Sequence, residues 1–119
     1  MQDFRKLRVW HAAKDFCLAV YRETESFPVH ERYGFTSQLR RASRSIPANI
    51  AEGSAYLGGN DSARFYQIGL GSSSECLSDM IICSDLGFLS GPQFDRLEGL
   101  LGPTRRQLVR LIQTSRGAR

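Results

Sequence analysis

The apolar residues of this 119-residue chain recur at steps of three and four positions, which predicts α-helices along its length. No segment alternates apolar and polar residues for long enough to indicate a β-strand. Turn-forming residues divide the pattern into four amphipathic stretches, and we expect helices over about residues 7–26, 34–55, 61–86 and 93–115. Four such helices with short connections favour an all-α fold, an antiparallel up-down-up-down four-helix bundle with residues 1–119 in one domain.

The second predicted helix contains a proline at Pro47. Proline has no backbone N–H and collides with the carbonyl group of Ser43, so we expect a kink there. The side chains of Asn49 and Glu52 are expected to hydrogen-bond near the kink, and Gly53 to end the helix. The apolar stripe stays in phase across the proline and consists of Phe35, Leu39, Ala42, Ile46 and Ile50.

The third predicted helix is apolar on two sides. One side carries Phe65, Ile68, Cys76, Cys83 and Leu86, and the nearly opposite side carries Leu70, Leu77 and Ile81. A helix in a bundle this small contacts its neighbours mainly through one face, so the second face needs another cover. We therefore predict that Leu70, Leu77 and Ile81 pack against another copy of the chain.

The start of the third helix and the course of the fourth can also be predicted. Asn60 or Asp61 is the expected N-cap of the third helix, after the turn residues Gly58-Gly59. Gly102-Pro103 predicts a bend or a short break in the fourth helix, and residues 116–119 a frayed tail. The apolar stripe of the fourth helix is Phe94, Leu97, Leu101, Leu108, Leu111 and Ile112.

The charge of the chain suggests nucleic acid as one possible partner. The formal net charge is +4, and 14 of the 16 basic residues are arginines, whose planar guanidinium suits phosphate or carboxylate. Arg40, Arg41 and Arg44 point away from the apolar stripe of the second helix, and Arg106 and Arg110 from that of the fourth. Solvent, phosphate and intersubunit ion pairs remain alternatives for these side chains, and a high genomic GC content would also enrich arginine. No sequence typical of base readout is present, so backbone contacts are the expected mode.

The carboxylates of the third helix could in principle mark a metal site. Glu75 and Asp79 are four residues apart and fall near an apolar face, but neither His11 nor His30 follows a glutamate by three positions. A di-iron bundle site is therefore not indicated, and we expect Glu75 to be buried and paired with an arginine, a tryptophan N–H or an amide.

The cysteines and the remaining motifs argue against catalytic chemistry. Cys17, Cys76 and Cys83 lie at apolar helical positions outside any C-x-x-C pair, which predicts buried free thiols. There is no G-x-S-x-G sequence and no phosphate loop, so we expect no enzyme activity, no cofactor and no bound metal. The apolar runs are too short to cross a membrane and no secretory signal is evident, which predicts a cytoplasmic location.

Several segments in a fixed order resemble a known family. They include Glu-Arg-Tyr-Gly, Leu-Arg-Arg and Ser-Ile-Pro-x-Asn-Ile-Ala-Glu-Gly, within Phe4–Trp10, Phe27–Arg41, Ser45–Gly53 and Arg64–Ser72. The chain resembles the bacterial four-helix-bundle proteins encoded in intervening sequences of 23S rRNA genes, which are related to the accessory variability determinant of diversity-generating retroelements. The resemblance implies a homopentamer with a basic surface, proposed to bind nucleic acid.

Two functional hypotheses follow from the residues and the resemblance together. The first is a non-enzymatic oligomeric scaffold that binds RNA or DNA through its outward arginines. The alternative is a protein-interaction adaptor whose basic face docks an acidic partner such as a reverse transcriptase. A salt titration of nucleic-acid binding separates the two, because phosphate contacts weaken steeply with salt.

Overall fold

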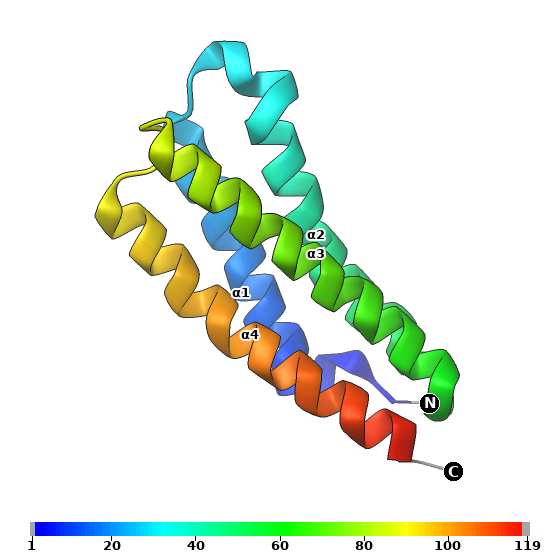
Figure 1. Cartoon of the computed structure of the whole chain (residues 1–119). Coiled ribbons are helices and arrows are strands. Elements are labelled where there is room, and N and C mark those ends of the chain that lie inside the picture. Colours follow the sequence, from blue (N-terminus) through cyan, green and yellow to red (C-terminus); the bar gives the residue numbers. More distant parts are fainter. Residues whose placement is uncertain (1, 118–119) are drawn as a thin grey trace.

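The computed structural model describes residues 2–117, which form four long helices joined by short turns (Figure 1). These helices are α1 (Arg8–Glu23), α2 (Ser37–Ser54), α3 (Gly59–Asp85) and α4 (Gly91–Gly117). The described part of the chain contains no β-strand, which confirms the all-α prediction. Of the tail that was predicted to fray, residues 116–117 are helical and residues 118–119 lie outside the described range.

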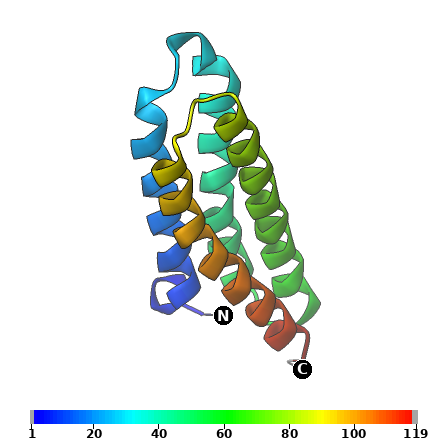
Figure 2. The ribbon, with the colours of Figure 1, turned by 60° about the vertical axis from the view of Figure 1, so that its left-hand side comes forward.

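The helices pack in their order along the chain. Contacts join α1 to α2, α2 to α3, α3 to α4 and α4 back to α1, and the chain direction reverses from each helix to the next (Figures 1 and 2). The resulting bundle is elongated, with principal extents of 48 × 23 × 20 Å. The N-terminal segment, the α2–α3 turn and the end of α4 lie at one end, and the α1–α2 connection and the α3–α4 turn lie at the other.

The predicted stripes of α2 and α4 are confirmed as core. Leu39, Ala42, Ile46 and Ile50 of α2 are buried, and Phe35 packs against them just before the helix begins. From α4 the buried apolar residues are Leu97, Leu101, Leu108 and Ile112, with Phe94 and Leu111 packed at the edge.

The predicted core face of α3 is only partly correct. Cys76 and Cys83 are buried as expected, but Ile68 and Leu86 are exposed at the surface. Their places in the core are taken by a stripe with several small or polar members: Ala63, Tyr66, Gly69, Ser73 and Met80. The difference arises because α2 and α3 approach closely there, which favours small residues over apolar ones.

The two helix prolines leave their helices continuous. α4 runs through Pro103 without a break, so of the predicted bend or short break at Gly102-Pro103 the break is wrong; Thr104 Oγ1 donates to the Leu100 carbonyl at 2.8 Å in the same turn. α2 likewise continues through Pro47. Asn49 Nδ2 donates to the Ser45 carbonyl at 2.8 Å, as expected of a side chain near the proline.

Two helix-end predictions are corrected as well. Glu52 is exposed and none of the hydrogen bonds among residues 2–117 uses its side chain, and Gly53 lies inside α2 rather than ending it. The turn is made, as predicted, by Gly58 and Gly59, whose φ angles of 95° and 69° fall in the region that favours glycine. Gly58 is also the N-cap of α3, in place of Asn60 or Asp61.

Candidate nucleic-acid interface

The α1–α2 connection builds a pocket at one end of the bundle. After α1 the chain forms short turns at η2 (Thr24–Ser26), η3 (Val29–Glu31) and η4 (Arg32–Thr36) before α2 begins. Phe27 adopts an extended conformation before Pro28 and is buried against Phe88, which fixes where the connection leaves α1. Glu31 Oε1 accepts the Phe35 N–H at 3.0 Å and holds the turn that leads into α2.

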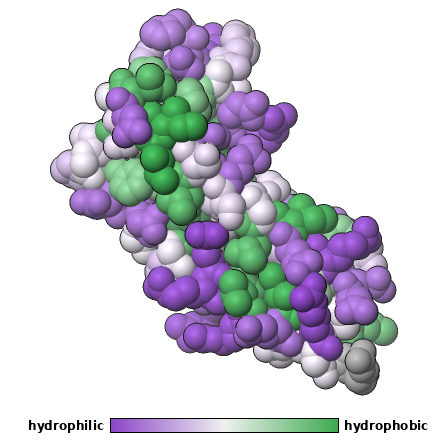
Figure 3. Space-filling model, viewed as in Figure 1, coloured by the Kyte–Doolittle hydropathy of each residue, from purple (hydrophilic) through white to green (hydrophobic). Residues whose placement is uncertain are grey.

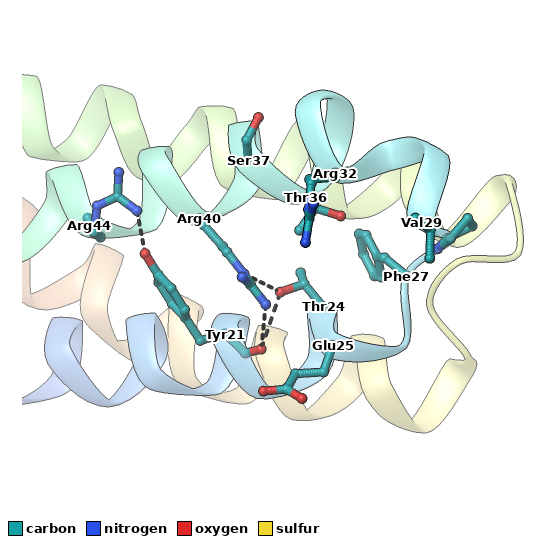
Figure 4. Close-up of a pocket in the computed structure, with 11 residues that line it drawn as sticks. Tyr21, Thr24, Glu25, Phe27, Val29, Arg32, Thr36, Ser37, Arg40 and Arg44 are labelled. Carbon is teal, nitrogen blue, oxygen red and sulfur yellow. Dashed lines mark hydrogen bonds between the residues drawn. The ribbon is translucent and has the colours of Figure 1, made fainter.

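Arg40 joins α2 to the end of α1 and does not project freely outward as predicted. Its Nε donates to Thr24 Oγ1 at 2.8 Å and its Nη2 to the Tyr21 carbonyl at 3.2 Å (Figure 4). The guanidinium also lies 4.7 Å from the centre of the Tyr21 ring. The last carbonyls of a helix lack intrahelical donors and attract positive charge, so Arg40 caps α1.

Arg44 and Arg32 bring two more guanidinium groups to the same pocket (Figure 4). Arg44 Nη1 donates to the Tyr21 hydroxyl. The side chains of Arg32 and Arg44 are both exposed. The hydroxyl-bearing residues Thr36 and Ser37 complete this side of the pocket. We call this group the arginine pocket, and define it by Arg32, Arg40 and Arg44.

The arginine pocket holds positive charge without a paired carboxylate. Among residues 2–117, no Asp or Glu oxygen lies within 4.0 Å of a guanidinium nitrogen of Arg32, Arg40 or Arg44. Glu25 lines the pocket but forms no such pair. Glu23 at the end of α1 is occupied by Arg96 Nε at 2.8 Å, which lowers the pKa of that carboxyl. Since a guanidinium has five N–H donors, each arginine keeps donors free for an anion.

Arg41 extends the same basic surface along α2. Its side chain is exposed and contacts Gln38 of its own helix. At 100° per residue, Arg40, Arg44 and Arg41 cover an arc of about 100°, from the side facing α1 to the outer face of the bundle. Arg41 and Arg44 therefore point outward as predicted, whereas Arg40 hydrogen-bonds to the end of α1.

A second basic groove lies at the other end of α1. Lys6, Arg8 and Arg110 line it between the start of α1 and the last turns of α4. Arg106 is exposed one turn before Arg110 but does not line this groove, and Arg5 is paired with Asp3 at 2.9 Å. The structure thus joins Arg110 to the N-terminal basic residues and leaves Arg106 separate.

The predicted subunit-interface residues divide into two groups. Leu77 and Ile81 line a shallow apolar groove on α3 together with Ile82, and the side chains of Ile81 and Ile82 are 47% and 42% exposed. Leu70 and Leu77 are both partly buried and pack against the core of their own subunit, so Ile81 and Ile82 provide most of the exposed apolar surface of this groove. Figure 3 shows apolar surface over α3 and α4 in two areas with polar side chains between them. We call Leu77, Ile81 and Ile82 the apolar groove.

The carboxylates of α3 do not behave as predicted. Glu75 is exposed, so the expectation of a buried and paired carboxylate is wrong. Asp79 is half-buried, and burial, with Glu75 one turn before it, raises the pKa of its carboxyl group. In residues 2–117 no group of three or more histidine, cysteine or acidic side chains could hold a metal ion.

Asp79→Asn should raise the melting temperature at pH 7. A carboxyl whose pKa is higher in the folded chain than in the unfolded chain destabilises the fold when ionised, so wild-type stability falls as pH rises through that pKa. The gain from Asp79→Asn should therefore shrink as the pH drops below the raised pKa and disappear below the ordinary aspartate pKa of 3.8, as thermal melts from pH 7 to pH 3 can show. Asp15→Asn, which removes an exposed carboxylate from α1, is the control; an equal gain there would contradict the role of burial.

The three cysteines differ in burial. Cys76 and Cys83 are buried free thiols as predicted, and burial raises the pKa of each to about 12, whereas Cys17 is only half-buried. Thiols that stay protonated at neutral pH are poor nucleophiles and metal ligands. None of the helices in residues 2–117 is both long and apolar enough to cross a bilayer.

One comparison with known proteins, the match to a family model, agrees with the resemblance seen in the sequence. A search of curated proteins gave no match. The family model described as 23S rRNA-intervening sequence protein matches residues 5–110, which include the arginine pocket, the apolar groove and all four helices except the end of α4. The chain belongs to the 23S rRNA-intervening sequence protein family.

Proposed function

We propose that this protein is a non-enzymatic homo-oligomer that binds the phosphate backbone of RNA or DNA. The observation that carries the proposal is the group of arginines without carboxylate partners along α2 and in the arginine pocket. Arg44 and Arg41 present exposed guanidinium groups, and Arg40 holds the end of α1 beside them. Such a surface reads charge and spacing rather than base sequence.

Oligomerisation would strengthen this weak surface. A net charge of +4 on one chain gives a modest field, but a ring of subunits repeats the arginine surface at every position. The apolar groove of α3 supports such an assembly because Leu77, Ile81 and Ile82 leave apolar area uncovered on a single subunit. Five subunits are what the family resemblance implies, and that number stays a prediction.

Arg41→Gln with Arg44→Gln should weaken binding to an unrelated RNA and to duplex DNA about tenfold at 100 mM salt. If the two side chains contact two phosphates, the slope of log affinity against log salt should also become shallower by about 1 to 2. Arg40 is left in place because it caps α1. Fluorescence anisotropy at several salt concentrations measures both quantities.

The matched control removes the same charge from α4. Arg106→Gln with Arg116→Gln changes two exposed arginines that line neither the arginine pocket nor the groove beside Arg110, and should leave affinity within about twofold of wild type. An equal loss from both pairs would show that only net charge matters. Binding that is absent even at low salt would reject the nucleic-acid proposal and favour the acidic protein partner.

A further inference from the structure

A small cavity opens at the end of the bundle where the α2–α3 turn meets the end of α4. Its volume is about 200 Å³, and Tyr56, Leu57, Tyr66, Leu111, Thr114 and Ser115 line it. The pockets that hold drug-sized ligands measure about 300–1,000 Å³, so this cavity has room for one flat ring system rather than a longer molecule. We call it the bundle-end cavity.

The walls of the bundle-end cavity suit a flat heterocyclic ring. Tyr56 is held in place by parallel stacking on Phe65, with ring centres 5.3 Å apart and planes 15° apart, and the Arg64 guanidinium lies 4.8 Å from the centre of the Phe65 ring. Leu57 is 89% exposed, which leaves its side chain available to cover a ligand. Tyr66 and Ser115 add hydroxyl-bearing side chains that can donate and accept hydrogen bonds.

The bundle-end cavity adjoins the basic groove at the start of α1. Leu111 and Thr114 line both hollows, so the two meet on the same turn of α4. Lys6, Arg8 and Arg110 supply positive charge in the groove, and no acidic side chain from residues 2–117 lines either hollow. A cavity with aromatic and hydroxyl-bearing walls therefore lies next to a site for an anion.

We infer that the bundle-end cavity and the basic groove together bind an unpaired nucleotide, with its base in the cavity and its phosphate beside Arg110. This inference rests on the proposed nucleic-acid function and adds a preference for unpaired bases, because a base inside a duplex cannot enter the cavity. Stacking of a base on an aromatic side chain contributes about 1–3 kcal/mol in single-strand binding proteins.

The test compares a single-stranded oligonucleotide with a blunt duplex of the same length. Thr114→Phe fills the cavity from an exposed position on α4 and should weaken single-strand binding about tenfold while leaving duplex binding unchanged. Gln113→Phe is the control, since Gln113 is also exposed, precedes Thr114 and lines neither hollow. Far-ultraviolet circular dichroism should show that both variants are folded. A 2-aminopurine base in the single strand should become protected from acrylamide quenching when the wild type or Gln113→Phe binds, but not when Thr114→Phe binds.

The possible results separate this inference from the proposed function. If duplex and single strand bind equally and Thr114→Phe changes neither, the inference is overturned while backbone binding stands. If no polymer binds at low salt, the proposed function fails and titration with AMP decides the inference. Saturable AMP binding that Thr114→Phe abolishes and Gln113→Phe retains would support a nucleotide site; no AMP binding would overturn it.

Discussion

Replacing Gly53 with alanine should lower the free energy of unfolding by about 2 kcal/mol and the melting temperature by about 8 °C. A Cβ at position 53 would lie 2.5 and 2.8 Å from two ring carbons of Tyr66 and 3.0 Å from the Ser62 carbonyl oxygen. The Tyr66 side chain is 2% exposed, and the Ser62 carbonyl is backbone that cannot move aside without a shift of α3. The expected overpacking penalty of about 3 kcal/mol exceeds the gain of about 1 kcal/mol that alanine brings to a helix interior.

Gly71→Ala is the matched control for this experiment. Gly71 lies inside α3, and an added Cβ there would meet no atom within 4 Å. This substitution should stabilise the protein by up to about 1 kcal/mol through helix propensity alone. Urea unfolding followed by circular dichroism at one protein concentration measures both variants. Equal stabilisation of Gly53→Ala and Gly71→Ala would show that α2 and α3 are not in close contact at Gly53.

The sequence predicted best those parts of the core that are formed mainly by large apolar residues, although Ser43 of α2 and Thr104 of α4 are buried beside them. The stripes of α2 and α4 are of this kind, because each places leucine or isoleucine at nearly every buried turn. The core face of α3 was predicted less well because Gly69 and Ser73 are buried there. A small residue at a close helix contact has no hydrophobic signal, and only the position of the neighbouring helix reveals it.

The same reasoning explains which site residues were predicted. The concentration of arginine on α2 is visible in the sequence, since Arg40, Arg41 and Arg44 lie on consecutive turns opposite the apolar stripe. That Arg40 caps α1 could not be predicted, because its acceptors are the hydroxyl of Thr24 and the carbonyl of Tyr21, 16 and 19 residues earlier. Arg32 was missed because it belongs to an irregular turn, where helical periodicity gives no direction.

The apolar groove and the bundle-end cavity differ in how visible they were. Leu77 and Ile81 were predicted as a second apolar face, whereas Ile82 lies about 140° from Leu77 around an ideal helix, so helical spacing alone could not add it to the groove. The bundle-end cavity combines Tyr56 with Thr114, from segments more than fifty residues apart in the chain. No local pattern joins such residues, and the antiparallel packing of α4 beside the α2–α3 turn brings them together.

Ile81→Lys should convert the protein from an oligomer to a single subunit at micromolar concentration. Ile81 is 47% exposed in the apolar groove, and an ammonium group buried in a subunit interface loses its hydration without gaining a partner. Ile68→Lys is a closely matched control, because Ile68 is 46% exposed on the same helix and lies outside the groove. Sedimentation velocity should show the wild type and Ile68→Lys at the same larger mass and Ile81→Lys at 13.4 kDa plus the small change in side-chain mass.

The two lysine variants also test whether assembly concentrates the basic surface. Each raises the net charge by one, so electrostatics alone predicts slightly tighter nucleic-acid binding for both. Loss of the assembly predicts the opposite for Ile81→Lys, whose affinity for a long RNA should fall about 100-fold because several linked arginine surfaces become one. Affinity that rises equally in both variants would separate nucleic-acid binding from assembly. A wild-type protein that sediments as a single subunit would remove the apolar groove as an interface, and the arginines of one chain would then have to account for any binding alone.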